Sequence, residues 1–229
     1  MIISHKHKFI FFKTKKTAGT SIEIVLSRYC NGKDIITPVD KQSNIVRRQL
    51  GIKPKNFRES IFDVTPKQTL YAILTASNKN LPKKYYNHMI ASELRRIIKP
   101  NLWDSYFKFT IERNPWDKAV SAYHYHIGVN KEDITFEEFI EKYNYFRNFH
   151  RYTIEGRVAV DFIIKYENLQ DDLTKALQKV GIEYDGWLPN AKGGFRKEKK
   201  KYKDCYSNCS KDRVADLCKD EIELFSYEF

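Results

Sequence analysis

A loop rich in lysine and hydroxyl side chains, KTKKTAGTS at 13–21, lies between an aromatic run and a segment with helical periodicity. Backbone N–H groups at a helix N-terminus bind anions, and Gly19 lets the backbone approach one closely. Thr20 and Ser21 add hydroxyl donors, and Lys16 adds a positive charge. The loop is not a Walker A motif, because Lys16 precedes the glycine. It predicts a phosphate-type anion site; the alternative is an ordinary surface turn.

A second group of residues, KFTIERNPWDKAVSAY at 108–123, combines a predicted strand with a predicted helix. Arg113 follows the strand, and Ser121 comes two helical turns later. An arginine at the carboxyl end of a strand faces the crevice where α/β proteins bind ligands, and its planar fork suits a phosphate. The alternative is a structural arginine paired with Glu112 or Asp117. Together with the first loop, this segment predicts one ligand that carries two separate anionic groups.

The composition sets the class of protein that must position these residues. The chain has 229 residues, of which 41% are hydrophobic, so it can bury a core as one domain over 1–229. The absence of an apolar run of about 18 residues argues against a membrane span. A net charge of +12 indicates an anionic partner: nucleic acid, polysaccharide, membrane surface or nucleotide. The cysteines lack a metal-binding or disulfide pattern, so we expect reduced thiols.

Strand and helix patterns alternate along the chain, which predicts an α/β fold. Capping-box spacing at Thr20–Glu23 and Thr135–Glu138 predicts two helix starts. Segment 31–87 is polar and weakly periodic, so we expect short helices and loops there. We expect strands at 8–12, 106–112 and 161–165, and helices at 22–29, in the latter part of 88–99, at 117–126, 136–146, 168–180 and 211–225. The expected fold is a P-loop-like three-layer domain with a mostly parallel central sheet flanked by helices.

Five ordered segments carry a family resemblance. KTKKTAGTS resembles the 5′-phosphosulfate loop of sulfotransferases that use 3′-phosphoadenosine 5′-phosphosulfate (PAPS), and RNPWDKAVSAY resembles their 3′-phosphate motif. HMIASELRR, FIIKYENLQDDL and KDEIELFSYEF resemble later parts of the carbohydrate-type branch, which includes heparan sulfate 2-O-sulfotransferase. The resemblance runs from about residue 9 to 229, and only 31–87 lacks a counterpart. This variable segment is a candidate for acceptor recognition.

The resemblance implies how the donor is held. Arg113 and Ser121 would bind the 3′-phosphate of PAPS, and the late basic loop, with Arg196 and Lys197, would close over the nucleotide. The residues implied for the 5′-phosphosulfate are Lys16, Thr17, Ala18, Gly19, Thr20 and Ser21. The product would be adenosine 3′,5′-bisphosphate, and no metal is implied.

Sulfuryl transfer requires a cation beside the departing oxygen and a base for the acceptor hydroxyl. Lys16 is the candidate cation. His88 aligns with the histidine that this branch uses as a base; the competing interpretation is a helix-start residue without chemistry. His124 and His126 are the next candidates, and Glu59 would serve if the base were a carboxylate.

The sequence therefore predicts a cytoplasmic sulfotransferase that moves sulfate from PAPS to a hydroxyl acceptor, with a glycan as the expected partner. Neither nucleic acid nor a membrane span is expected, and the oligomeric state is left open. One alternative is a nucleotide or small-molecule kinase, although a Walker lysine and an evident magnesium-binding Asp are missing. Another is a basic nucleic-acid-binding protein, suggested by the lysine-rich stretch 192–203.

Overall fold

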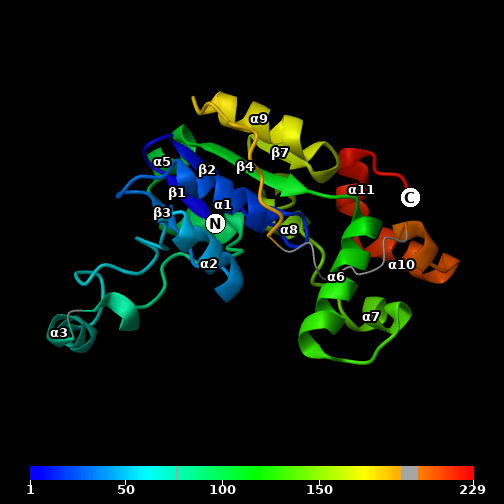
Figure 1. The fold of residues 1–229 in the computed structure, drawn as a ribbon, viewed down its shortest axis with the longest axis horizontal. Helices are drawn as coiled ribbons and strands as arrows, with labels where there is room; N and C mark the ends of the chain where they lie inside the picture. Colours follow the sequence, from blue (N-terminus) through cyan, green and yellow to red (C-terminus); the bar gives the residue numbers. More distant parts are fainter. Residues whose placement is uncertain (76, 192–200) are drawn as a thin grey trace.

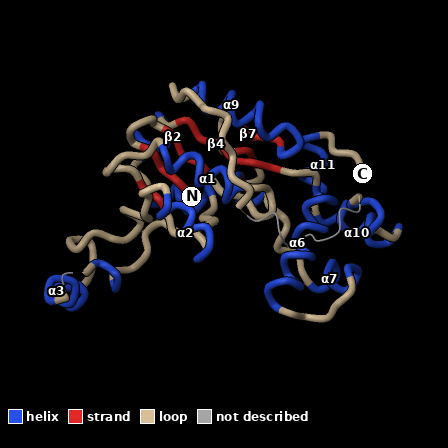
Figure 2. The backbone as a smooth tube through the Cα atoms, in the orientation of Figure 1, coloured by secondary structure: helices blue, strands red, loops and turns tan. Residues whose placement is uncertain are grey.

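A five-stranded sheet with the order β3–β1–β2–β4–β7 forms the centre of the molecule in the computed structural model, which describes residues 1–75, 77–191 and 201–229 (Figures 1 and 2). Its strands are β1 (Ile2–Ser4), β2 (Phe9–Phe11), β3 (Ile35–Ile36), β4 (Phe107–Glu112) and β7 (Phe162–Lys165). The pairs β2–β4 and β4–β7 are parallel, whereas β1 is antiparallel to both β2 and β3. Only β1 of these strands runs against the rest, so the expected mostly parallel sheet is confirmed.

Helices cover both faces of this sheet. Because side chains alternate along a strand, Phe9 and Phe11 enter one core cluster while Ile10 and Phe12 enter another. The first cluster lies under α1 (Gly19–Arg28) and α9 (Leu169–Lys179). The second lies under α4 (Ala91–Ile97) and α5 (Pro100–Ser105). The predicted three-layer α/β fold is confirmed.

A helical part lies beside the sheet and has its own apolar cluster around Trp116 and Phe139 (Figure 2). It contains α6 (Pro115–Asn130), α7 (Phe136–Lys142), α10 (Asn208–Leu217) and α11 (Lys219–Phe225). The remaining elements are α2 (Lys41–Gln49), α3 (Pro66–Leu74), η1 (Asn78–Asn80), α8 (Phe149–Tyr152), the hairpin β5 (Thr153–Ile154) and β6 (Arg157–Val158), η2 (Tyr166–Asn168) and η3 (Tyr202–Cys205). Segment 31–87 thus contains mainly short helices and loops, as expected.

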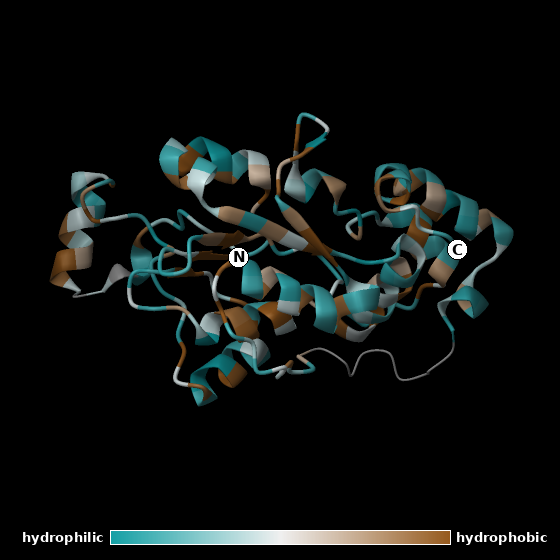
Figure 3. Cartoon of the chain, turned by 90° about the horizontal axis from the view of Figure 1, so that it is seen from above, coloured by the Kyte–Doolittle hydropathy of each residue, from teal (hydrophilic) through white to brown (hydrophobic). Residues whose placement is uncertain are grey.

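An arm formed by residues 60–81 carries α3 away from the sheet, at the left of Figure 1. The arm exposes two large apolar side chains, Phe62 at 88% and Leu74 at 75%. Hydrophobic residues of α3 are visible at the left of Figure 3. The backbone N–H of Glu59 donates to the Pro82 carbonyl at 2.9 Å, which closes the base of the arm. The arm is therefore attached through two neighbouring backbone segments.

The two predicted capping boxes have different outcomes. At α7, the Thr135 hydroxyl accepts from the Glu138 N–H at 3.2 Å, and the Glu138 carboxylate accepts from the Thr135 N–H at 2.7 Å, which confirms that box. At α1 the prediction is wrong, because the residue before the helix is Ala18, in a left-handed conformation. The carboxylate of Glu23 is buried and accepts from Lys13 Nζ at 2.8 Å.

Other expectations about elements also differ from the structure, among them the helix expected at 136–146, which ends at Lys142. Strands β1 and β3 were not predicted, because each is too short to show periodicity. Each is specified by its pairing with the other in the sheet. Pro100 follows α4 as expected but also begins α5, where a proline tolerates the first helical position. The single helix expected over 211–225 breaks at Cys218, and the break leaves Glu221 of α11 buried.

Candidate functional site

The loop at 13–21 joins the carboxyl end of β2 to the N-terminus of α1. Ala18 has φ 63°, and the first intrahelical bond runs from the Ile22 N–H to the Ala18 carbonyl, at 3.2 Å. The N–H groups of the first helical turn thus have no acceptor within the helix. A Cβ at Gly19 would lie 2.9 Å from Lys13 Cγ and 3.3 Å from the Thr14 carbonyl oxygen. Only glycine fits this tight turn without displacing its neighbours.

Hydroxyl groups in this loop have distinct partners. The Thr14 hydroxyl donates to the Ile111 carbonyl, so the Thr17 hydroxyl donates its own proton to Thr14, at 2.7 Å. Thr17 is fully buried, and its hydroxyl therefore serves the loop itself. The Ser21 hydroxyl accepts from the Ala191 N–H at 3.3 Å and retains its own proton for a ligand.

Arg113 follows β4, the parallel neighbour of β2, so its side chain lies at the same end of the sheet as the loop. Its Nε and Nη2 donate to Asp117 at 2.9 and 2.6 Å, and its Nη1 donates to the Lys16 carbonyl at 3.3 Å. The guanidinium also stacks 4.1 Å from the ring centre of Tyr166. The pairing with Asp117, which the sequence offered as the alternative interpretation of Arg113, is present, and the arginine also joins the two predicted segments through the Lys16 carbonyl.

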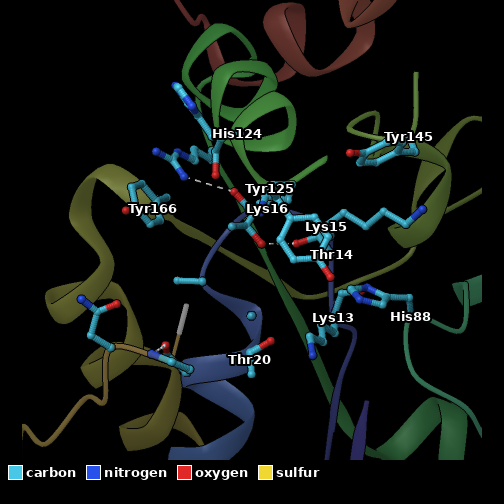
Figure 4. A pocket seen from close by; sticks show the side chains of 18 residues that line it. Lys13, Thr14, Lys15, Lys16, Thr20, His88, His124, Tyr125, Tyr145 and Tyr166 are labelled. Carbon is cyan, nitrogen blue, oxygen red and sulfur yellow. Dashed lines mark hydrogen bonds between the residues drawn. The ribbon is translucent and has the colours of Figure 1, made fainter. Parts of the chain in front are cut away.

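One cavity of about 610 Å³ brings the two segments together (Figure 4). It is lined by Lys13, Thr14, Lys15, Lys16, Thr17, Ala18, Gly19, Thr20, Ser21, His88, Arg113, Ser121, His124, Tyr125, Tyr145, Tyr166, Asn190 and Ala191. Every residue assigned to the donor or to catalysis within the described ranges is on this wall. Arg196 and Lys197 lie outside the described residues.

The described lining of the cavity is cationic and contains no aspartate or glutamate. Lys16 Nζ lies 4.1 Å from the ring centre of Tyr125, and Lys15 Nζ lies 5.4 Å from that of Tyr145. Burial lowers the pKa of Lys15, and the charge of Arg151 lowers it further. A basic wall of this kind concentrates anions.

His88 faces the cavity from the segment before α4. Its Nδ1 lies 3.1 Å from the Lys13 carbonyl oxygen, and its own carbonyl accepts from Arg151 Nη1 at 3.0 Å. Because a carbonyl only accepts, Nδ1 carries the proton and Nε2 keeps its lone pair. Burial, followed by the charge of Lys13, lowers the pKa of His88 to about 3. The imidazole is therefore neutral at physiological pH, as a base must be.

The other candidate bases differ in position. His124 lines the cavity (Figure 4). His126 is buried, and its Nε2 lies 2.6 Å from a Glu132 oxygen outside the cavity wall. Glu59 pairs with Lys84 at 3.3 Å and does not line the cavity. Among these alternatives, the structure brings only His124 to the site.

Several lining residues were missed by the sequence reasoning. Tyr166 directly follows β7, so its place at the carboxyl end of a parallel strand was a usable signal. Tyr125 comes four residues after Ser121 on α6, so its place on the same helix face was also a usable signal. Tyr145 and Asn190 come from segments that converge only in the fold, and the sequence carries no comparable signal for them.

The described residues, 1–75, 77–191 and 201–229, lack two further features. No group of three or more His, Cys, Asp or Glu side chains within them is arranged to hold a metal ion. No helix within them has the length and apolar character needed to cross a membrane.

Comparison with known proteins shows the family to which the chain belongs. An uncharacterized protein of Archaeoglobus fulgidus is 41% identical over 101 residues, covering 41% of this chain and 83% of that protein. A sulfotransferase from Alicyclobacillus acidocaldarius is similar in structure, with a TM-score of 0.48, 17% identity and 96% coverage of each chain. Retinol dehydratase in complex with androsterone and the inactive cofactor PAP has a TM-score of 0.44 and 12% identity, covering 99% of this chain and 84% of that one. Residues 1–228 match the sulfotransferase family, and the chain belongs to that family.

Proposed function

We propose that the protein transfers the sulfuryl group from PAPS to a hydroxyl of a carbohydrate acceptor. The observation that carries this proposal is the single cationic cavity that joins the loop at 13–21 to Arg113 and Ser121. PAPS has anionic groups at both its 5′ and 3′ ends, and the two segments offer one set of donors for each. Membership of the sulfotransferase family supports sulfuryl transfer as the reaction class.

The residues present fit this donor. The close contacts at Gly19 leave a backbone cradle whose helix N-terminal N–H groups suit the 5′-phosphosulfate. Arg113 and Ser121 would take the 3′-phosphate, and the ring of Tyr166 lies on the same side of the cavity. A volume of about 610 Å³ falls within the range of pockets that enclose such ligands. Arg196 and Lys197 remain proposed as a cover over the nucleotide.

Bound PAPS would supply an activated sulfuryl group. In the proposed step the acceptor oxygen attacks sulfur while the bond to the nucleotide phosphate oxygen breaks, and the electron pair stays on adenosine 3′,5′-bisphosphate. Lys16 stabilises the negative charge that develops on that oxygen. His88 Nε2 takes the proton of the acceptor hydroxyl, and its Nδ1–H keeps the ring oriented through the Lys13 carbonyl.

The acceptor side of the proposal rests on the cavity wall opposite Tyr166. Tyr145, Lys15 and His88 lie together there in Figure 4. Aromatic faces suit the apolar face of a sugar ring, and half-buried lysine donors suit its hydroxyl groups. Segment 31–87, which leads directly to His88, is proposed to recognise the rest of the acceptor. A cytoplasmic location and a single domain over 1–229 remain parts of this proposal.

The test measures formation of adenosine 3′,5′-bisphosphate from PAPS with a panel of glycans. Lys16→Ala is expected to lower kcat by about a hundredfold or more, and His88→Ala is expected to abolish transfer while retaining bisphosphate binding. Lys33→Ala, at an exposed lysine away from the cavity, serves as the control. A thermal shift with adenosine 3′,5′-bisphosphate that AMP reproduces in full would contradict the proposed 3′-phosphate site.

A further inference from the structure

Asn148 is a fully buried residue before α8 that contacts the loop of the donor site without lining the cavity. Its Oδ1 accepts from the Lys15 N–H at 2.9 Å, and its Nδ2 donates to the Lys15 carbonyl at 2.9 Å. The amide orientation follows from chemistry, because a backbone N–H only donates and a carbonyl only accepts. Both backbone groups of Lys15 are thus held by one side chain.

The same amide also reaches a buried group of charges. Nδ2 donates to Glu112 Oε1 at 3.3 Å, and the backbone N–H of Asn148 donates to Glu221 Oε1 at 2.9 Å. Lys118 Nζ lies 2.7 Å from Glu112 Oε1 and 3.6 Å from Glu221 Oε1. The four side chains are at most 1% exposed. We call Glu112, Lys118, Asn148 and Glu221 the buried network.

The buried network joins the two ends of the donor site. Lys118 lies one helical turn before Ser121 on α6, and Glu112 Oε1 also accepts from the Arg113 N–H at 2.9 Å. Asn148 connects these groups to Lys15, the neighbour of Lys16. A shift of Asn148 would therefore move the phosphosulfate loop relative to the 3′-phosphate residues.

The loop needs such support, because Lys16 has a backbone φ of 61°, which residues other than glycine rarely adopt. Conformations of this kind persist only where the surrounding structure holds them. Asn148 holds the residue before Lys16, and Arg113 Nη1 donates to the Lys16 carbonyl at 3.3 Å. Without Asn148, two part-buried backbone groups of Lys15 would lose these partners.

We propose that Asn148 is a positioning residue, which holds the Lys15–Lys16 backbone in the geometry that the donor requires and couples the loop to α6 through the buried network. The inference rests on the proposed function for its effect on the donor. The two hydrogen bonds between Asn148 and the Lys15 backbone do not depend on the proposed function, and amide hydrogen exchange at Lys15 tests them separately.

The experiment compares Asn148→Ala and the isosteric Asn148→Asp with wild type. Asn148→Asp keeps an acceptor for the Lys15 N–H, loses both donors and adds a charge beside Glu112 and Glu221. Asn44→Ala is the matched control, because the Asn44 amide donates to the Val39 carbonyl at 2.8 Å, away from the cavity. Amide hydrogen exchange of 13–21 is measured without ligand. Affinity for adenosine 3′,5′-bisphosphate is measured by calorimetry, and kcat and acceptor KM are measured with PAPS.

We expect Asn148→Ala to speed exchange at Lys15, because it removes the acceptor of the Lys15 N–H. We expect both Asn148 variants to weaken bisphosphate binding at least about tenfold and to lower kcat by about 10²-fold, with little change in acceptor KM. A merely structural role would instead lower only the thermal midpoint, as in Asn44→Ala, and would overturn the proposal. If Asn148→Asp does not fold because of its buried charge, Asn148→Ala decides. If wild type binds no bisphosphate, the proposed function fails. Unchanged exchange at Lys15 in Asn148→Ala would separately overturn the role of Asn148 in holding the Lys15 backbone.

Discussion

At the scale of single residues, His88 and Lys16 share a left-handed backbone, with φ 63° and 61°. Each such conformation costs of the order of 1–3 kcal/mol and is found mainly at functional sites. The neighbours of both residues hold them in place: Lys13 and Arg151 bond to His88, and Arg113 bonds to the Lys16 carbonyl. The backbone thus aims the two proposed catalytic side chains before any ligand arrives.

The first prediction concerns the protonation of His88. Burial, followed by the charge of Lys13, lowers its pKa to about 3, so the free enzyme keeps a neutral base down to that pH. The kcat/KM for transfer should therefore stay level from pH 8 to pH 5, without an acid limb near the ordinary histidine value of about 6.5. Initial rates over this range measure it. An acid limb near pH 6.5 in the wild-type kcat/KM would contradict the assignment.

The same shift has a consequence for stability. Between about pH 6.5 and 3 the unfolded chain binds a proton at residue 88 that the folded chain does not bind. Stability should therefore fall as the pH decreases through this window. The fall should be shallower in His88→Gln than in wild type, as measured by urea unfolding at several pH values.

At the scale of elements, α6 organises the site. It begins at Pro115 after an Asn114 cap and carries Asp117, Lys118 and Ser121 on successive parts of its first two turns. Asp117 holds the Arg113 guanidinium, and Lys118 pairs with two carboxylates in the interior. Lys118 keeps its proton: burial alone would lower its pKa, but Glu112 and Glu221 raise it above the ordinary value.

The element-scale prediction is that Lys118→Met strongly destabilises the fold. The change leaves Glu112 and Glu221 buried without their cation, and breaking a buried pair in this way costs about 3–5 kcal/mol. Urea unfolding measures the loss. Lys142→Met is the control, because Lys142 pairs with Glu132 at a similar 2.6 Å but its side chain is 57% exposed. Equal losses in the two variants would show that burial is not the source of the effect.

At the scale of the whole molecule, the arm at 60–81 is separable from the rest. Its base is closed by the Glu59–Pro82 backbone bond and by a bridge between Arg58 and Lys83. The cavity wall contains no residue of the arm, and α3 lies far from the loop of the donor site in Figure 1. The donor site and the arm therefore occupy different parts of the fold.

The whole-molecule prediction follows from this separation. Replacing 61–79 by a short glycine-rich turn should leave the affinity for adenosine 3′,5′-bisphosphate within about twofold, since no donor contact is removed. The acceptor KM should rise, because segment 31–87 is proposed to recognise the acceptor. Calorimetry with adenosine 3′,5′-bisphosphate measures the first effect, and steady-state kinetics at varied glycan acceptor concentration measures the second. An unchanged acceptor KM would show that the arm takes no part in acceptor recognition.

Much of the fold could be read from local patterns. Periodicity predicts strands with aromatic and β-branched residues, such as β4. It also predicts helices with one apolar face, such as α9. The Thr135–Glu138 box was equally local and is present. The Thr20–Glu23 box was misread because Glu23 bonds with Lys13, a contact that no spacing rule reveals.

The sequence by itself determined which chemistry to look for: an anion loop after the first buried strand, and an arginine and a serine after the next. It also pointed to His88 through the resemblance. Only the tertiary structure decided that these segments line one cavity, that the His88 proton sits on Nδ1, and that Asn148 holds the loop. The physical reason is that local backbone preferences show in neighbouring residues, whereas burial and hydrogen-bond partners come from residues far apart in the chain.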